Sequence, residues 1–242
     1  MGVKILMPIL TIAHGTYNNF NRFKKTFFNI LNQLDKHPEV EFLILDDSQD
    51  ESSKKLVNKY KHKQIKYIKG TKISIDHAYI KLMREASGEY VWWFGDDLIF
   101  DDSIIKLLKI LQKNHPDFIW LNHKNTSKVK NLNKNYKFNA SEIIENIGDL
   151  LTYLSAIVWK KSYILPHLEY GHEFFGNAIG FCYPQFEALS KEGFFLYVDD
   201  PLFQSEIKRD FKNLWYDPFD VFCTHYFHLL ENFYHKKNMV KA

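Results

Sequence analysis

Cysteine is scarce in this chain of 242 residues, which contains only Cys182 and Cys223. Two cysteines cannot build the disulfide framework of a small secreted domain, and these two lack metal-ligand spacing, which favours a reducing compartment. Long hydrophobic runs are missing as well, since no stretch approaches the ~20 apolar residues that a membrane-spanning helix needs. The net charge is +3 and no nucleic-acid recognition motif occurs, so nothing indicates a nucleic-acid partner.

Several motifs that handle phosphates or carry out hydrolysis are also absent. No Gly-x-Gly-x-x-Gly follows the first apolar segment and no Gly-x-x-x-x-Gly-Lys-Ser/Thr occurs, which argues against a dinucleotide-binding Rossmann domain and a P-loop. His172-Glu173-Phe174-Phe175-Gly176 lacks the second histidine of a zinc-protease helix, and there is no Gly-x-Ser-x-Gly nucleophile elbow. The content of 45% hydrophobic and 25% charged residues is that of an ordinary globular protein with a sizeable core.

Segments with strand and helix patterns alternate through the first half of the chain. Strands are predicted over residues 3–7, 40–45, 64–68, 89–94 and 117–121, and helices over 20–34, 48–60, 75–86 and 102–113. Ser48 with Glu51 is typical of a capping box at the start of the second helix. This alternation implies parallel strands with right-handed crossovers, and so an α/β fold: a mostly parallel central sheet with helices on both faces.

The pattern changes after Leu121, although residues 1–242 are interpreted as one domain with two functional halves, 1–121 and 122–242. Residues 122–139 are rich in Lys and Asn and are predicted to form a loop or irregular insertion. The expected elements after it are a helix from Ser141, an apolar stretch over 153–159, a helix near 183–191, a strand over 194–198 and an aromatic helix over 219–235. Spacing alone does not decide whether that last helix packs on the domain, docks a second copy of the chain or rests on a bilayer.

Two pairs of adjacent carboxylates follow predicted strands. Asp46-Asp47 ends the strand over 40–45, and Asp96-Asp97 ends the aromatic strand over 89–94. Parallel strands of one sheet share an edge at their carboxyl ends, where ligands of open α/β sheets bind, so the two pairs should lie near each other. Adjacent acids repel each other unless a cation or a donor-rich ligand lies between them. The alternatives are solvated loop acids at Asp96-Asp97 and a helix N-cap around Ser48.

Four segments carry a resemblance to a known family, and their order is worth more than any one of them. They are Lys4-Ile5-Leu6-Met7-Pro8, residues 42–50 with Asp46-Asp47-Ser48, Ile75-Asp76-His77-Ala78, and residues 86–97 ending in Asp96-Asp97. In these segments the first half of the chain resembles the family 2 glycosyltransferases, which have the nucleotide-sugar-binding GT-A fold. The last segment is the most specific, because it resembles the family's Ala-x-Gly-Glu-Tyr strand and its Asp-x-Asp-type motif.

The resemblance implies an inverting transfer of a sugar from a nucleotide-diphosphate donor, UDP- or GDP-linked, to a saccharide or lipid-linked saccharide acceptor in surface polysaccharide biosynthesis, such as lipopolysaccharide or capsule. It implies a divalent metal, Mn²⁺ or Mg²⁺, on the diphosphate, held by Asp97 with Asp96 beside it and acting as a Lewis acid. The residues for which it implies contact with the nucleotide sugar are Pro8, Thr11, Asp46, Asp47, Asp76 and Asp96.

The chain departs from the family pattern in three places. Phe94-Gly95 stand where many relatives carry a further acid, so one metal-side carboxylate is absent. Residues 11–19 form a longer loop than the family's tight turn, and His14 in it suits a solvent-exposed loop as well as a phosphate contact. Phe181-Cys182 stand where relatives carry an acidic pair with the catalytic base. The base must take a proton from the acceptor hydroxyl, and the remaining candidates are Glu173, which we favour, and His172.

Two other functions stay open. The first is a non-catalytic GT-A-like carbohydrate-binding or scaffold protein, because the metal motif and the base are both imperfect. The second is a sugar-phosphate nucleotidyltransferase, although its Gly-rich signature loop after the first strand is missing. The opening residues are too short for a targeting segment, so we expect a cytoplasmic location, with peripheral contact at the inner face of the membrane and a homodimer as open alternatives.

Overall fold

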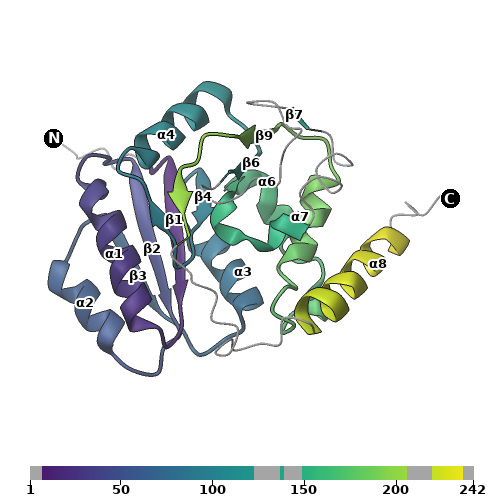
Figure 1. The fold of residues 1–242 in the computed structure, drawn as a ribbon, viewed down its shortest axis with the longest axis horizontal. Helices are drawn as coiled ribbons and strands as arrows, with labels where there is room; N and C mark the ends of the chain where they lie inside the picture. The colour runs from purple at the N-terminus through teal and green to yellow at the C-terminus, as the bar shows by residue number, and fades with distance from the viewer. Residues whose placement is uncertain (1–6, 123–136, 139–148, 206–219, 237–242) are drawn as a thin grey trace.

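The computed structural model describes residues 7–122, 137–138, 149–205 and 220–236 (Figure 1). Its strands are β1 (Leu10–Thr16), β2 (Val40–Asp46), β3 (Ile65–Lys69), β4 (Tyr90–Trp93), β5 (Leu98–Ile99), β6 (Phe118–Leu121), β7 (Lys137–Phe138), β8 (Ile157–Lys160), β9 (Phe195–Val198) and β10 (Phe203–Gln204). Its α-helices are α1 (Phe20–Leu34), α2 (Ser52–Tyr60), α3 (Ile75–Glu85), α4 (Ser103–Asn114), α6 (Lys161–Ile164), α7 (Cys182–Leu189) and α8 (Tyr226–Lys236). Short turns of other helix types are η1 (Asp149–Thr152), η2 (Leu154–Ala156), η3 (Leu165–His167), η4 (His172–Phe174) and η6 (Asp220–His225).

The described strands form one large sheet and one small ribbon. The large sheet has eight strands in the order β3-β2-β1-β4-β8-β6-β9-β7, and β5 pairs with β10 in the ribbon. Strand β8 runs antiparallel to β4 and β6, and β7 runs antiparallel to β9, whereas the remaining pairs of the large sheet are parallel. The prediction of a mostly parallel central sheet in an α/β fold is therefore confirmed.

The long loop predicted over residues 11–19 is wrong for most of its length, whereas the strand predicted over 3–7 lies almost entirely outside the described residues. Residues 1–6 lie outside the described part of the chain, and β1 occupies Leu10–Thr16, where we expected a long loop. Strand β1 pairs with β2 on one side and β4 on the other, so its side chains are almost all buried. The sequence of a central parallel strand is usually a continuous hydrophobic run. Here the polar residues Thr11, His14 and Thr16 interrupt that run, so the pattern does not indicate a buried strand.

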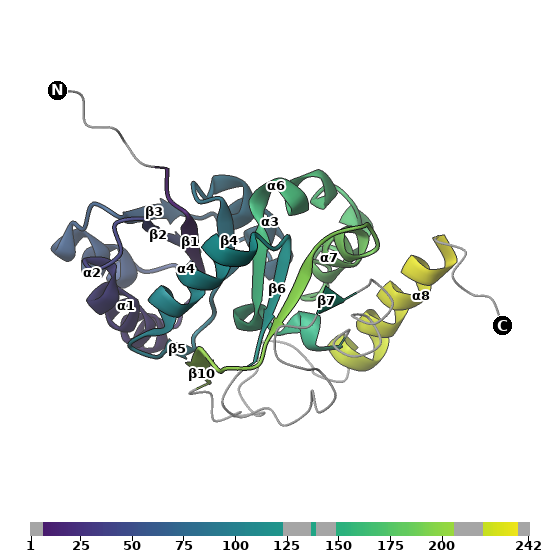
Figure 2. The same cartoon turned by 90° about the horizontal axis from the view of Figure 1, so that it is seen from above.

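Helices cover both faces of the parallel strands (Figure 2). Helices α1 and α2 lie on one face and α3 lies on the other, as right-handed crossovers require for this strand order. The predicted bounds of α1 are confirmed, and its buried face includes Phe23 and Phe27. On the opposite face, Tyr79 of α3 stacks on Trp93 of β4 with ring centroids 4.9 Å apart.

The capping box at Ser48 was also wrong. Helix α2 begins at Ser52, and its N-cap residue Glu51 makes no side-chain capping hydrogen bond. The hydroxyl of Ser48 instead accepts a hydrogen bond from the backbone N–H of Asn18, at 2.9 Å. Ser48 therefore fastens the loop after β2 to the loop after β1, at the edge of the sheet where the acidic pairs were expected.

The second half adds strands to the sheet and a helical cover. The apolar stretch over 153–159 contains η2 and the start of β8, whereas the helix expected from Ser141 starts outside the described residues. Helix α8 packs on α7 through buried residues that include Phe233, whose ring lies 5.5 Å from that of Phe186. Among the described helices, none has the length and apolar character needed to cross a membrane.

Candidate active site

The two acidic pairs lie at one edge of the large sheet. Strands β2 and β4 flank β1 and all three run in parallel, so their carboxyl ends lie together. Asp46 is the last residue of β2, and Asp96-Asp97 follow β4 after Phe94 and Gly95. The prediction that the two pairs share an edge is confirmed.

Asp46 is fully buried and already has partners. One of its oxygens, Oδ2, accepts a hydrogen bond from the Tyr67 hydroxyl at 2.6 Å and lies 3.7 Å from the Lys69 ammonium. The other, Oδ1, accepts from the backbone N–H of Ser48 at 2.9 Å. Burial raises the pKa of Tyr67, and its hydrogen bond to Asp46 raises it further, so the phenol stays protonated and donates. Asp46 therefore shapes the loop after β2.

Asp47 is buried as well, but one carboxylate oxygen has no partner among the described residues. Its Oδ1 makes no hydrogen bond, and burial raises the pKa of the carboxyl group even though backbone N–H groups of Lys72 and Ile73 and the charge of Lys81 act to lower it. The carboxylate sits where a side chain at Gly70 would be, because a Cβ there would lie 1.6 Å from Asp47 Oδ1. Gly70 thus makes the room that Asp47 occupies.

The loop after β1 is fixed against the loop after β2. The backbone N–H of Asp47 donates to the carbonyl of Thr16 at 3.0 Å, and that of Gln49 donates to Asn18 Oδ1 at 3.0 Å. Asn18 has a φ of 48°, a left-handed conformation that Asn tolerates better than most residues. Sequence reasoning missed Thr16 and Asn18 because it predicted a long loop over residues 11–19.

Asp96 and Asp97 differ sharply in their surroundings. The Asp96 side chain is 22% exposed and lies 3.9 Å from His14 Nε2 and 3.9 Å from the Arg22 guanidinium, through different oxygens. Asp97 is buried, and its Oδ2 accepts a hydrogen bond from the Tyr153 hydroxyl at 3.2 Å. Burial raises the pKa of Asp97, although hydroxyl groups including that of Ser155 act in the other direction.

His14 is a buried strand residue, not an exposed loop histidine. Its side chain is 0% exposed and packs against Phe23 of α1, with ring centroids 5.7 Å apart. Its Nδ1 lies 2.9 Å from the carbonyl oxygen of Phe94, and its Nε2 has no hydrogen-bond partner among the described residues. The imidazole therefore connects β1 to the start of the Asp96-Asp97 loop.

Four buried polar atoms without a hydrogen-bond partner gather at this edge. Within the described part of the chain they are His14 Nε2, Thr16 Oγ1, Asp47 Oδ1 and Asp97 Oδ1. Buried polar atoms are nearly always hydrogen-bonded in folded proteins, and leaving one without a partner costs about 1–3 kcal/mol. Such a cluster on the ends of three adjacent strands indicates a site built for a ligand that supplies donors and a cation.

The second half of the chain closes on the end of β4. Ser155 Oγ accepts a hydrogen bond from the backbone N–H of Gly95 at 2.9 Å, and the Ser155 carbonyl accepts from Trp92 Nε1 at 2.8 Å. Together with the hydrogen bond from Tyr153 to Asp97, these bonds hold the Asp96-Asp97 loop. His14 contacts the same loop from the N-terminal part of the chain, whereas Tyr153 and Ser155 belong to its second half. The apolar stretch over 153–159 was predicted, but its polar contacts were not.

Two of the residues proposed for nucleotide-sugar contact, Pro8 and Thr11, lie apart from this cluster, and a third, Asp76, has partners in the protein. Pro8 precedes β1, and its carbonyl accepts a hydrogen bond from Glu89 before β4, so it lies at the opposite edge of the sheet. Thr11 is buried in β1, where its hydroxyl donates to Glu41 at 2.6 Å and accepts from the Gly88 N–H at 2.8 Å. The carboxylate of Asp76 is occupied by two backbone N–H groups, those of Gly176 and Phe181.

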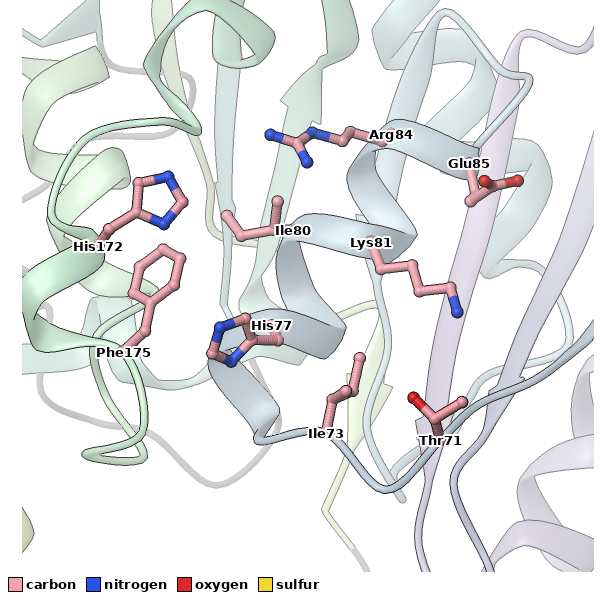
Figure 3. A pocket seen from close by; sticks show the side chains of 9 residues that line it. All are labelled: Thr71, Ile73, His77, Ile80, Lys81, Arg84, Glu85, His172 and Phe175. Atoms are coloured by element: carbon pink, nitrogen blue, oxygen red, sulfur yellow. The ribbon is translucent and has the colours of Figure 1, made fainter.

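One of the two predicted base candidates, His172, lies beside α3. A cavity of about 400 Å³ adjoins this helix, with walls that include His77, Lys81, Arg84, His172 and Phe175 (Figure 3). His172 Nε2 lies 3.1 Å from Glu169, which also pairs with Arg84, and Glu173 is exposed. None of the four edge carboxylates lines the cavity, so the structure brings His172 to α3 and not to Asp96-Asp97.

The sequence matches the family model described as Glycosyl transferase family 2 over residues 11–186. The chain belongs to glycosyltransferase family 2. A comparison with curated proteins finds no match. The matched residues include the sheet edge described above and the segment up to α7.

Solved structures of glycosyltransferases share the fold. Staphylococcus aureus TarS 1–349 in complex with UDP has a TM-score of 0.64 and 17% identity, over 81% of this chain and 60% of that one. The same protein in complex with UDP-GlcNAc has a TM-score of 0.62 and 14% identity, over 88% and 63%. The mannosyltransferase PcManGT from Pyrobaculum calidifontis, in complex with GDP-Man and Mn²⁺, has a TM-score of 0.59 and 14% identity, over 84% and 59%. The chain spans about 60% of the length of these structures, and the fold is of the GT-A type.

A divalent ion of the kind used by GT-A enzymes fits the carboxylates present here. Asp97 Oδ1 is a buried oxygen without a hydrogen-bond partner among the described residues, and Asp96 lies next to it in the same loop. No three His, Cys, Asp or Glu side chains of the described residues form a closed metal cage. That is compatible with Mg²⁺ or Mn²⁺ chemistry, because Mg²⁺ is commonly bound by one or two carboxylates plus substrate phosphates and waters.

The usual acidic pair of the family is missing from the start of α7. Cys182 is the first residue of α7 and is fully buried, and burial raises the pKa of its thiol well above the ordinary value. The backbone N–H of Phe181 donates to Asp76, so this segment is fastened to α3. Phe181 and Cys182, which replace the family's acidic pair, are therefore buried packing residues.

Proposed function

We propose that this chain is an inverting glycosyltransferase that transfers a sugar from a nucleoside-diphosphate donor to a saccharide or lipid-linked saccharide acceptor. The observation that carries the proposal is the cluster of buried carboxylate, hydroxyl and imidazole atoms without partners at the carboxyl ends of β1, β2 and β4. The family and the nucleotide-bound neighbours support a donor of this class. Surface polysaccharide biosynthesis remains the expected pathway.

Asp47 is the residue we assign to the nucleoside. Its Oδ1 can accept a hydrogen bond from an N–H of the base or a hydroxyl of the ribose, whereas both oxygens of Asp46 already have partners in the protein. Asp46 then acts on the nucleoside indirectly, by fixing the loop that carries Asp47. Pro8 and Thr11 drop out of the proposed contact set because of the positions described above, and Asp76 is left out because both of its oxygens accept backbone hydrogen bonds.

Asp96 and Asp97 are the residues we assign to a divalent ion, Mn²⁺ or Mg²⁺. A bound ion of this kind neutralises charge on the diphosphate leaving group as the sugar is transferred. Around it, Tyr153 and Ser155 hold Asp97 and its loop in position. Arg22 adds a positive charge beside Asp96 that a diphosphate would also meet.

Glu173 remains our proposed general base and His172 the alternative. Glu173 is an exposed carboxylate, and its neighbour His172 is paired with Glu169. A base acts by taking the proton of the acceptor hydroxyl as that oxygen attacks the anomeric carbon. The cavity along α3, with Phe175 and Lys81 in its walls, is the proposed acceptor side.

A thermal-shift comparison tests the donor class. The protein is heated with UDP or GDP, each with and without Mn²⁺, because a ligand that binds only the folded state raises its melting temperature. We expect one nucleotide to stabilise the protein and Mn²⁺ to increase the effect. Adenosine diphosphate serves as a control nucleotide, and the absence of any nucleotide-dependent shift would contradict the proposal.

The missing acidic pair at Phe181-Cys182, together with the imperfect metal motif at Phe94-Gly95, favours a second function. A non-catalytic carbohydrate-binding protein of the same fold would bind nucleotide or saccharide without releasing the nucleoside diphosphate from a sugar donor. Release of UDP or GDP in the presence of Mn²⁺ and a mixture of saccharide acceptors separates the two. Pyrophosphate release from a nucleoside triphosphate and a sugar phosphate would instead indicate a nucleotidyltransferase.

A further inference from the structure

The tautomer of His14 follows from its surroundings. Its Nδ1 lies 2.9 Å from the carbonyl oxygen of Phe94, and a carbonyl only accepts hydrogen bonds. The hydrogen of the neutral ring is therefore on Nδ1, and Nε2 carries a lone pair. This lone pair is buried, has no hydrogen-bond partner in the described part of the chain, and faces the Asp96-Asp97 loop.

The distance from His14 Nε2 to Asp96 Oδ1 is 3.9 Å. That separation is longer than a hydrogen bond, which spans about 2.7–3.2 Å between heavy atoms. It is shorter than the sum of two metal–ligand bonds of about 2.1 Å each, so a single small divalent ion can contact both atoms. Ligands at right angles in an octahedral site lie about 3.0 Å apart, so the partly exposed Asp96 side chain has to move closer to His14 for both atoms to bind one ion.

We propose that His14 Nε2 is a nitrogen ligand of the divalent ion and binds it together with Asp96. This inference rests on the proposed function, since the ion is the one assigned above to the donor diphosphate. His14 takes over from the acid that many relatives carry at the position of Phe94, and the carbonyl of the same Phe94 orients the imidazole. Metal-binding histidines are usually oriented in this way, by a carbonyl or carboxylate on the other ring nitrogen.

A nitrogen ligand changes which ion the site prefers. Carboxylates, carbonyls and water suit Mg²⁺, whereas imidazole suits transition metals and is a poor ligand for Mg²⁺. Among the described residues, no three His, Cys, Asp or Glu side chains are grouped so that they could hold an ion, so diphosphate oxygens and water fill most of the remaining coordination positions. An imidazole beside a carboxylate therefore favours a transition-metal ion such as Mn²⁺ over Mg²⁺, and the donor diphosphate completes the site.

The test is pulsed electron paramagnetic resonance of bound Mn²⁺, which detects a directly coordinated nitrogen without any turnover. Wild-type protein is loaded with Mn²⁺ and whichever of UDP or GDP stabilises it. We expect a ¹⁴N modulation that becomes a ¹⁵N modulation when the protein is labelled with ¹⁵N-histidine. Bound Mn²⁺ without any histidine nitrogen coupling would overturn the inference while leaving the proposed function intact.

Two substitutions at His14 extend the test. His14→Asn keeps an N–H in the place of Nδ1 for the Phe94 carbonyl but removes Nε2. We expect this variant to bind Mn²⁺ about 10- to 100-fold more weakly, because loss of a residue that only orients a metal ligand already has an effect of that size. His14→Gln puts an amide oxygen near the place of Nε2, which should restore part of the affinity and abolish the histidine nitrogen coupling. Unchanged Mn²⁺ affinity in folded His14→Asn would overturn the inference.

The matched control is His62→Asn. His62 lies outside the sheet edge and pairs with the exposed Asp35 at 3.0 Å, so its loss should leave Mn²⁺ binding and the nitrogen coupling unchanged. Circular dichroism of each variant confirms that it is folded before metal is added. If wild-type protein binds neither UDP nor GDP in the presence of Mn²⁺, the proposed function fails together with this inference.

Discussion

Asp76 in the first turn of α3 accepts hydrogen bonds from Phe181, 105 residues later in the chain. The backbone N–H of Phe181 lies 3.0 Å from Asp76 Oδ1, and that of Gly176 lies 2.7 Å from Oδ2. One buried carboxylate thus fastens the loop before α7 to the helix on the other side of the cavity. The residue belongs to the family's diphosphate-side segment by resemblance, but its contacts here are with the protein's own second half.

Removing this carboxylate should loosen the second half. In Asp76→Ala, two backbone N–H groups lose their partner inside the protein, and each unsatisfied group costs about 1–3 kcal/mol. We expect the free energy of unfolding, measured by urea denaturation, to fall by about 2–5 kcal/mol. The control is Asp101→Asn, at an exposed position before α4, which should change stability little.

Asp76 also makes stability depend on pH, in a direction that can be worked out. Burial raises the pKa of its carboxyl group above the usual 3.8, in spite of the hydrogen bonds that oppose the shift. The native state therefore binds more protons than the unfolded state between 3.8 and the raised pKa, so stability falls as the pH rises through that window. Asp76→Asn cannot titrate, so the stability difference between wild type and Asp76→Asn should change in this window. A constant difference would contradict the prediction.

The sequence predicted the repeating part of the fold well. Helix α1 and strand β2 were visible because each has a clear period, 3.6 residues for the buried face of α1 and a continuous apolar run for β2. The shared edge of Asp46-Asp47 and Asp96-Asp97 then followed from topology alone. These features depend on local pattern and on the handedness of crossovers.

The site was harder to predict, because its parts are long-range. Strand β1 was missed because His14 and Thr16 are polar residues in a buried strand, and only pairing with β2 and β4 explains their burial. Tyr153 and Ser155 meet the Asp96-Asp97 loop from nearly sixty positions away, with sequence separations of 56 and 60 for their hydrogen bonds. No periodicity in a single sequence encodes such contacts.

Gly70 provides a sharp test of the nucleoside site. A Cβ at this position would overlap Asp47 Oδ1, so Gly70→Ala must push the carboxylate out of its place. We expect the affinity for the stabilising nucleotide, measured by isothermal titration calorimetry, to fall about tenfold, as losing one hydrogen bond of about 1.4 kcal/mol would produce. Gly15→Ala is the matched control in β1, since its Cβ would lie 3.7 Å from its nearest neighbour, an ordinary contact. Equal losses in both variants would count against a specific role for Asp47.

Asp47 and Asp46 should respond differently to loss of charge. Asp47→Asn removes the charge from a carboxylate whose Oδ1 has no hydrogen-bond partner among the described residues, so it should weaken nucleotide binding about tenfold with little effect on stability. Asp46→Asn disrupts the bonds to Tyr67 and Ser48, so it should lower the free energy of unfolding by about 1–3 kcal/mol, and weaken binding only through the loop. Glu51→Gln, at an exposed residue beyond the same loop, is the control. If Asp46 rather than Asp47 contacted the nucleoside, Asp46→Asn would be as stable as the wild type but would not bind nucleotide.

The base assignment is tested by separating turnover from donor binding. If Glu173 takes the acceptor proton, Glu173→Gln should lower kcat by about 10²- to 10⁴-fold and leave the affinity for the donor nucleotide unchanged. His172→Gln removes an imidazole that is already paired with Glu169, so its kcat should fall much less. The pH profile of kcat adds an independent readout, because loss of the true base removes the acidic limb of the curve. A kcat that is unchanged in Glu173→Gln but lost in His172→Gln would transfer the role to the histidine, and full activity in both would move the search for the base to the sheet edge around Asp96.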